Sequence, residues 1–515
     1  MQSATPYLPD LLAALQTSVG GILPELLLIA GFLLAIVLEI TVSKGNKTLL
    51  GWTAMGAIVL YIAANLLFWP AERPTDSGFL NMITVDRYAA YLKLLIAFCC
   101  LLSVVAAQQS TKLRIHSKGM GEYFIVLLGM LVGMVFMTMA RNLLMLYIAL
   151  EMVSLPAYAL TAYARMKQKG AEAALKYVIY GCFASGLMLY GISWLYGFTG
   201  SLDPQSAAFG HGLAAAGHWP VTMMIALVLG GFAFKVGTLP FHFWLPDVME
   251  GAPHAVASLF AVAPKVAGFA MLIRFFAMLR HGMGEDQSAQ LPELLKHIEW
   301  LLAAMAIGSM VLGNLAALRQ DRFRRMLAYS SIAQAGYLLT GVLMFQAQSY
   351  AVVMFYLTVY ALMNMSAFLL AGWLEEEAGI VRIKEMKGLA TGMPWVAGLA
   401  TLSMISLTGL PPTAGFIAKL RLFLAGLTEY KAEDNPLIVG LLVIVLLNTV
   451  VSLFYYMRVS STMIFGNPVI KIWPAFRGWV PSILVILAIP MLWLGIISFD
   501  RFINYLQDLL PFVNG

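Results

Sequence analysis

The sequence is poor in charged residues. Asp, Glu, Lys and Arg make up 11% of its 515 residues, whereas hydrophobic residues make up 61%. A soluble domain carries about 25% charged residues, so this composition excludes a cytosolic globular enzyme, a disordered chain and a disulfide scaffold. The mean hydropathy of +0.82 is typical of a polytopic membrane protein, in which most of the surface meets lipid.

Cysteine is also scarce. The three cysteines, Cys99, Cys100 and Cys182, lie in apolar runs without a CxxC pair, and the seven histidines are not spaced as metal ligands. We therefore expect no zinc, iron–sulfur cluster or haem on this chain, and interpret the cysteines as small buried residues. Residues 1–20 contain no Lys or Arg, so the basic start of a signal peptide is missing, and we interpret 21–40 as a mature helix.

Long apolar runs, by contrast, fill the chain. Fourteen of them approach or exceed the length of about 20 residues that a membrane helix needs. They cover residues 21–42, 50–69, 87–107, 122–140, 142–162, 174–198, 222–246, 255–279, 298–318, 327–345, 349–374, 390–428, 437–458 and 479–500. Because backbone inside lipid must satisfy its own hydrogen bonds, we predict an all-α polytopic membrane protein in which residues 1–515 form one membrane domain.

Two of these runs are interrupted by glycine and proline. Residues 237–240 read Gly-Thr-Leu-Pro, and residues 409–412 read Gly-Leu-Pro-Pro. Because proline has no N–H donor, both predict broken helices, the seventh and the twelfth. An offset of five spans puts the breaks in units of opposite topology, as in inverted-repeat transporters. We therefore predict three N-terminal helices at 21–107, inverted repeats at 122–279 and 298–458, and a C-terminal helix at 479–500.

The distribution of Lys and Arg predicts the orientation. With the N-terminus outside, 18 of the 32 basic residues lie in loops on the inner side and 7 lie on the outer side. Positive charge is enriched in cytoplasmic loops, so the distribution favours both termini outside.

Four ionisable residues lie deep inside the runs. They are Glu151, the one acid that we place deep in a span, and Lys235, Lys265 and Lys419. A charge at mid-membrane costs about 2.5–3.5 kcal/mol on insertion scales and marks function by default. A lysine removed from water gives up its proton more readily, and a movable carboxylate partner makes such a lysine a switchable proton site. Two alternatives stay open: a static ion pair at Glu151, and lysines that reach along their helices to water.

Weaker signals come from other polar residues. Lys176, near the inner end of the sixth run, is either a member of a proton path or a charge that sets topology. We interpret Lys93 and Arg274 as charges near the membrane surface. Hydroxyl and amide groups that either hold a water chain or bond across helices lie on three later runs: Tyr329, Ser330, Ser331, Gln334, Asn364 and Asn448.

Three segments are similar to signature segments of one family. They read KVGTLPFHFWLPDVMEGAPHAVASLFAVAPKVAGF (235–269), RMLAYSSIAQAGYLL (325–339) and GLPPTAGFIAKLRLF (409–423). They resemble the antiporter-like subunits of proton-pumping NADH:quinone oxidoreductase, respiratory complex I, and the resemblance extends over the whole chain. Within that family the N branch is the most similar. The length argues against the larger L branch, and Lys419 argues against the M branch, in which a glutamate is expected.

The resemblance implies a role in proton translocation for five residues. The matched positions are Glu151 on helix five, its partner Lys235 on helix seven, the central relay lysine Lys265 on helix eight, Lys419 on helix twelve, and Lys176 on helix six. It also implies transport coupled to quinone reduction elsewhere in a complex. FMN, iron–sulfur clusters and the quinone are then expected in partner subunits, with no cofactor or metal on this chain.

The implied partners are the other membrane and peripheral subunits of complex I, neighbouring antiporter-like subunits included, and the lipid bilayer of a bacterial plasma membrane; nucleic acid is not expected. One departure concerns helix ten, where the family often has SSISH and this chain has SSIAQ. Because the amide of Gln334 does not titrate, a proton step at this position has to run through water. Two rival hypotheses stay open: a subunit of a multi-subunit sodium/proton antiporter, and a scaffold that does not pump.

Overall fold

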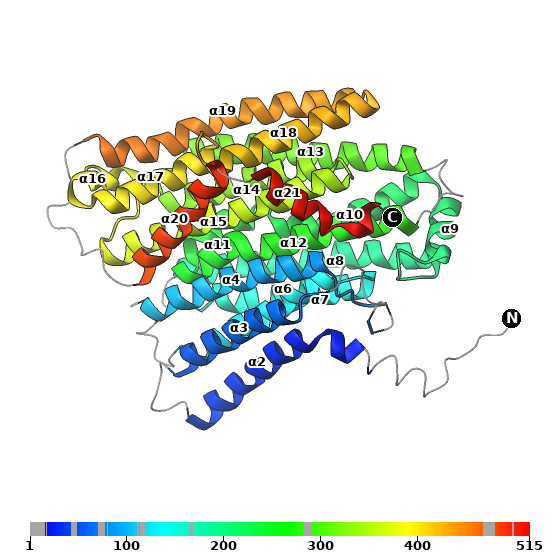
Figure 1. Cartoon of the computed structure of the whole chain (residues 1–515), viewed down its shortest axis with the longest axis horizontal. Helices are drawn as coiled ribbons and strands as arrows, with labels where there is room; N and C mark the ends of the chain where they lie inside the picture. Colours follow the sequence, from blue (N-terminus) through cyan, green and yellow to red (C-terminus); the bar gives the residue numbers. More distant parts are fainter. Residues whose placement is uncertain are drawn as a thin grey trace.

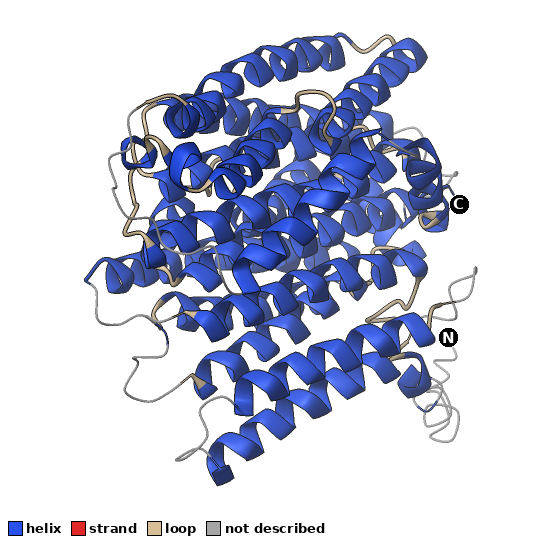
Figure 2. Ribbon diagram, turned by 60° about the vertical axis from the view of Figure 1, so that its left-hand side comes forward, coloured by secondary structure: helices blue, strands red, loops and turns tan. Residues whose placement is uncertain are grey.

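The computed structural model describes residues 16, 18–42, 49–70, 78–79, 81–110, 113, 120–163, 168–282, 291–466, 479–496 and 499–514, and within them it is nearly all helical (Figure 2). The helices are, in chain order, α2 (Leu23–Val42), α3 (Leu49–Leu67), α4 (Arg87–Gln109), α6 (Gly121–Met139), α7 (Leu143–Thr161), α8 (Gln168–Thr199), α9 (Ala207–Ala216), α10 (His218–Val236), α11 (Trp244–Gly251), α12 (His254–Gly282), α13 (Leu291–Leu318), α14 (Phe323–Val342), α15 (Ala347–Glu377), the 3-10 turn η2 (Ile383–Met386), α16 (Leu389–Gly392), α17 (Pro394–Thr408), α18 (Ala414–Glu433), α19 (Pro436–Ile464), α20 (Trp479–Ile496), α21 (Phe499–Asp508) and α22 (Pro511–Asn514).

The membrane spans agree with the sequence prediction in kind. Among the described residues, eleven helices are long and apolar enough to cross a bilayer, or twelve if α20 and α21, which meet at 95°, form one bent span. Each of the fourteen predicted runs coincides with at least one helix, but α14, α17 and α18 do not meet the same test. The total of fourteen spans therefore stays a prediction. The short helix α9, between α8 and α10, was not predicted.

The long helices lie roughly parallel, and their burial differs from the edges to the centre. In Figure 1, α2 and α3 lie at one edge of the molecule and α19 lies at the opposite edge. The most apolar stretch of α12 is entirely buried and that of α15 is 94% buried, whereas only 17% of the corresponding stretch of α2 is. α12 is therefore the centre of the fold, and Lys265 lies on it.

Polar residues at helix starts help to fix where the helices begin. The side chain of Asn142 accepts a hydrogen bond from the backbone N–H of Met145 at 2.7 Å and caps α7. Asp86 caps α4 in the same way, by accepting from the N–H of Ala89 at 2.8 Å. Each cap satisfies one of the N–H groups that the first turn of a helix leaves without a partner.

Both predicted helix breaks are present, and the same backbone motif closes them. α10 ends at Gly237 (φ 73°) and α17 ends at Gly409 (φ 86°). Both glycines are left-handed, and the two residues that follow each helix donate back to one carbonyl, that of Ala233 in the first case and that of Ile405 in the second. This pattern is the Schellman motif, which favours glycine because a Cβ is strained at positive φ.

Candidate functional site

Lys235 is buried in the last turn of α10, where it faces α7. Its side chain is 2% exposed, and its amine donates a hydrogen bond to the hydroxyl of Ser154 at 3.1 Å. Ser154 follows Glu151 by one turn of α7, so the predicted acid lies beside the lysine's acceptor. Among the described residues Lys235 forms no ion pair, and Oε1 of Glu151 is buried without a hydrogen-bond partner. The predicted pair is therefore close but not in direct contact.

Lys265 is buried at the centre of the molecule with an extensive set of partners. It is 1% exposed, and its amine donates to both the hydroxyl and the backbone carbonyl of Ser331 on α14, at 2.6 and 2.7 Å. The Ser331 hydroxyl is 2.7 Å from the hydroxyl of Tyr360 on α15, and Asn364 donates to Tyr360 at 2.7 Å. This lysine is hydrogen-bonded inside protein and does not reach toward water.

Two glycines bring the stems of these lysines to one interface. A Cβ on Gly268 of α12 would lie 2.8 Å from Val236 and 3.6 Å from Cγ of Lys235. A Cβ on Gly237 would lie 3.8 Å from Cε of Lys265. Small residues allow membrane helices to approach closely. The end of α10 therefore packs directly against the middle of α12, and the side chains of Lys235 and Lys265 start from this contact.

Lys419 lies on α18 and reaches back to the end of α17. It is 7% exposed, and its amine donates to the carbonyl of Thr408 at 2.8 Å and to that of Leu407 at 3.3 Å. The amine also lies 4.7 Å from the ring centre of Tyr337. Nε2 of Gln334 donates to the same Leu407 carbonyl at 3.1 Å. Gln334, which stands where the resembled family often has histidine, thus shares a hydrogen-bond acceptor with Lys419.

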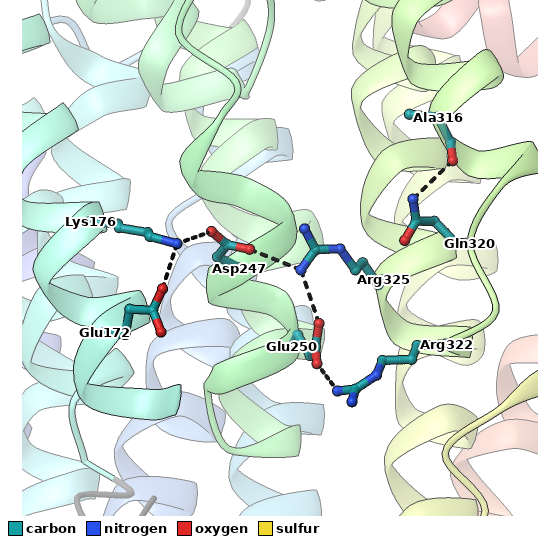
Figure 3. Close-up of polar contacts among 8 residues, drawn as sticks. All are labelled: Glu172, Lys176, Asp247, Glu250, Ala316, Gln320, Arg322 and Arg325. Atoms are coloured by element: carbon teal, nitrogen blue, oxygen red, sulfur yellow. Dashed lines mark hydrogen bonds and ion pairs between the residues drawn. The ribbon is translucent and has the colours of Figure 1, made fainter. Parts of the chain in front are cut away.

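Lys176 differs from the other three lysines because it lies at the surface. Its side chain is 41% exposed, and it belongs to a chain of alternating charges that joins α8, α11 and α14 (Figure 3). These ion pairs connect, in order, Glu172, Lys176, Asp247, Arg325, Glu250 and Arg322. Lys176 lies 2.7 Å from Glu172 and 2.8 Å from Asp247, and Arg325 approaches the other oxygen of Asp247 at 2.9 Å. Partly exposed pairs of this kind are individually weak.

Two buried ion pairs were missed by the sequence analysis. Arg274, interpreted as a surface charge, is 3% exposed and forms two hydrogen bonds with Asp86, at 2.7 and 2.9 Å. Lys93, interpreted in the same way, is 2% exposed and lies 2.7 Å from Glu25. Glu25 is 1% exposed and is therefore an acid buried in a span, whereas Glu151 itself is only half-buried. Both pairs join residues far apart in sequence, so no local pattern predicts them. The one signal in the sequence is that acids such as Glu25 are rare in apolar surroundings.

The comparisons with known proteins identify the family of this chain. The family described as NADH:quinone oxidoreductase/Mrp antiporter, TM matches residues 140–433. NADH-quinone oxidoreductase subunit N 2 of Chloroherpeton thalassium is 38% identical over 460 residues, which cover 88% of this chain and 87% of that protein. The chain belongs to this family.

Two solved structures share the fold. A chain of respiratory complex I from Thermus thermophilus is 29% identical with a TM-score of 0.74, covering 92% of this chain and 97% of that one. A chain of the Mrp complex from Dietzia is 20% identical with a TM-score of 0.79, covering 96% of both, and that likeness concerns the fold alone. The family match contains all five predicted site residues and Arg274, whereas Glu25, Asp86 and Lys93 lie before it.

Proposed function

We propose that this chain is a proton-translocating membrane subunit of NADH:quinone oxidoreductase, of the N type. The observation that carries the proposal is the row of three buried lysines, each bonded to an oxygen on a neighbouring helix or half-helix: Lys235 to Ser154, Lys265 to Ser331 and Lys419 to Thr408. Charged amines in membrane spans are otherwise avoided. The relatives named as subunit N support the assignment to that branch.

In the proposed mechanism, Lys235 alternates between two acceptors. It donates to Ser154, and Glu151, one turn away, offers a buried oxygen. A carboxylate stabilises an ammonium more than a hydroxyl does, so the two positions differ in proton affinity. A unit charge pair 4 Å apart interacts with about 4 kcal/mol near a protein surface. Moving one charge against 100 mV requires about 2.3 kcal/mol, so a change in the Glu151–Lys235 separation alters the proton affinity of Lys235 by an amount of the size that one step requires.

Lys265 and Lys419 then exchange protons along the row and with the two faces of the membrane. At the other end Lys176 is the exposed member, which meets water before the buried lysines do. The energy for the cycle comes from electron transfer in partner subunits, which we expect to hold FMN, the iron–sulfur clusters and the quinone.

We also propose the orientation and the setting. The basic loops between the spans support both termini on the outer side of a bacterial plasma membrane. The repeated motif at Gly237 and Gly409 supports inverted repeats at 122–279 and 298–458, because each would then contain one broken helix with the same closure. Partners would be the neighbouring antiporter-like, other membrane and peripheral subunits of the complex.

A sodium/proton antiporter subunit is the second candidate. The family description, which names the Mrp antiporter beside the oxidoreductase, favours it. The relatives named as NADH-quinone oxidoreductase subunits weigh against it. Purification of the chain in its native complex distinguishes the two, because only the oxidoreductase brings flavin and iron–sulfur subunits with it.

The direct test replaces Lys265 with methionine in the native complex. Membrane vesicles are energised with NADH, and the number of protons moved per NADH oxidised is measured with a pH-sensitive dye. We expect Lys265→Met to lose most of the pumping, and Lys384→Met, at an exposed lysine of η2, to retain the wild-type ratio. Full pumping by Lys265→Met would overturn the proposal and favour a scaffold that does not pump.

A further inference from the structure

We infer that Gln334 is a positioning residue for Lys419, and that it acts through the backbone carbonyl of Leu407. The inference rests on the proposed function and assigns a task to the residue that departs from the family pattern. The two side chains do not bond to each other. They donate to one acceptor, from α14 on one side and from α18 on the other.

The shared carbonyl belongs to the last turn of α17. In a continuous helix, the N–H of the residue four positions later would bond to it. Here the helix stops at Gly409, whose N–H bonds to Ile405 and Ser406 instead, and residue 411 is a proline without a donor. The carbonyl of Leu407 is thus left to side chains, and its two lone pairs accept from Gln334 at 3.1 Å and from Lys419 at 3.3 Å.

The orientation of the Gln334 amide is fixed by its surroundings. The hydroxyl of Tyr356 donates to Oε1 at 2.5 Å, and Nε2 lies 3.4 Å from the hydroxyl of Tyr456 as well as facing Leu407. A rotation of the amide by half a turn would place Oε1 against the carbonyl oxygen, which repels it. The side chain is 1% exposed, so an amide without these partners would be a buried unsatisfied group.

This arrangement limits how firmly α17 holds the ammonium. Gln334 occupies one of the two acceptor positions on the Leu407 carbonyl, and the contact of Lys419 there is longer than its contact with Thr408. Without the amide, the ammonium would take both carbonyls fully and give up its proton more slowly. Gln334 thereby helps Lys419 to release its proton.

The same helix connects this site to the central lysine. Ser331, which accepts from Lys265, precedes Gln334 by one turn of α14. A movement of α14 that follows a change at Lys265 therefore shifts the donor on the Leu407 carbonyl as well. Because each contact is a hydrogen bond within one packed core, a change at Lys265 reaches Lys419 without a titrating group between them.

The test measures protons moved per NADH oxidised by the native complex, normalised to the amount of assembled complex. Gln334→Met keeps the length of the side chain and removes the donor. We expect it to lower the ratio as far as Lys419→Met does, with NADH oxidation retained. Gln334→His, whose ring N–H can reach the carbonyl, is expected to retain more than half of the wild-type ratio. Gln320→Met is the matched control, since Gln320 contacts none of the three buried lysines and its side chain donates to the carbonyl of Ala316, four residues earlier.

The outcomes separate the two claims. A structural role alone would lower the amount of assembled complex and leave the ratio per complex unchanged, and this result would overturn the inference. If Lys419→Met pumps normally, the proposed function fails as well; if Lys419→Met loses pumping and Gln334→Met does not, only the present inference fails. Should Gln334→Met not assemble, Tyr356→Phe, which releases the amide, decides the matter: a wild-type ratio overturns the inference and a reduced one supports it.

Discussion

Lys235 donates its hydrogen bond to Ser154, and Oε1 of Glu151, one turn before Ser154 on α7, has no hydrogen-bond partner among the described residues. The lysine therefore rests beside the acid and has a second acceptor already in place. A neutral hydroxyl holds an ammonium less firmly than a carboxylate does, so this state is the one in which Lys235 parts with its proton most easily. In the proposed relay, this hydrogen bond to Ser154 is the starting position of Lys235.

The first prediction concerns Ser154→Ala. Without the hydroxyl, we expect the amine of Lys235 to turn to Glu151, one turn away on α7, and to stay paired with it. Since a hydrogen bond to a charged group contributes about 1.5–3 kcal/mol, we expect the pumping rate in vesicles to fall by roughly ten-fold or more, with NADH oxidation less affected. Ser461→Ala, at an exposed hydroxyl that bonds only to Arg458 of α19, serves as the control. Unchanged pumping by Ser154→Ala would show that the hydroxyl has no part in the cycle.

The second prediction concerns the break in the twelfth span. Gly409 has φ 86°, and a Cβ there would lie 2.8 Å from Cδ of Lys419. A left-handed non-glycine residue costs about 1–2 kcal/mol, so we expect Gly409→Ala to lower the melting temperature of the complex and to reduce pumping. Gly398→Ala on α17 is the matched control, because its Cβ meets nothing within 4 Å. Equal behaviour of the two variants would contradict the assigned role of the break.

The third prediction concerns the Asp86–Arg274 pair. Removing one partner of a buried pair leaves an uncompensated charge and typically destabilises by about 3–5 kcal/mol. Asp86→Asn should therefore lower thermal stability strongly, while Asp86→Leu combined with Arg274→Met recovers part of the loss. The partly exposed pair of Arg421 and Asp500 gives the comparison, and Asp500→Asn should change stability little. A small effect of Asp86→Asn would mean that water reaches the pair.

The fourth prediction concerns Lys176. Because this side chain is 41% exposed, water and Glu172 can carry part of the proton exchange that we propose for Lys176. We expect Lys176→Gln to slow pumping only partly, to a smaller extent than Lys265→Met, and we expect the effect to depend on ionic strength, since salt screens exposed charges. Complete loss of pumping at every salt concentration would instead place Lys176 in the relay on equal terms with the buried lysines.

Much of this arrangement could be read from the sequence. Apolar length predicted the helices, and Gly-Thr-Leu-Pro and Gly-Leu-Pro-Pro predicted the breaks, because both signals are local in the chain. The depth of Lys235, Lys265 and Lys419 within their runs predicted their burial for the same reason. The roles of these residues in proton translocation stay predictions that the experiments above address.

The partners of these residues could not be read from the sequence. Ser331 and Lys265 are 66 positions apart, and Asp86 and Arg274 are 188 apart, so no local pattern connects them. Lys93 was misjudged because its position in the outer third of a span suits a side chain that reaches the surface. Only the fold, which brings Glu25 of α2 to 2.7 Å from the amine of Lys93, reveals that an acid lies there instead.

The end of α17 has a consequence for the direction of charge flow. A helix terminus of this polarity bears a fixed partial negative charge, and Lys419 is seated on it. Unlike Glu151, this counter-charge is made of peptide dipoles, so it attracts a proton without being able to bind one. A proton that arrives at Lys419 has no acidic neighbour on which to rest among the residues described, and it leaves only by departing from the lysine nitrogen itself. The peptide dipoles at the end of α17 thus favour a charged Lys419 but offer no group to which its proton could be passed.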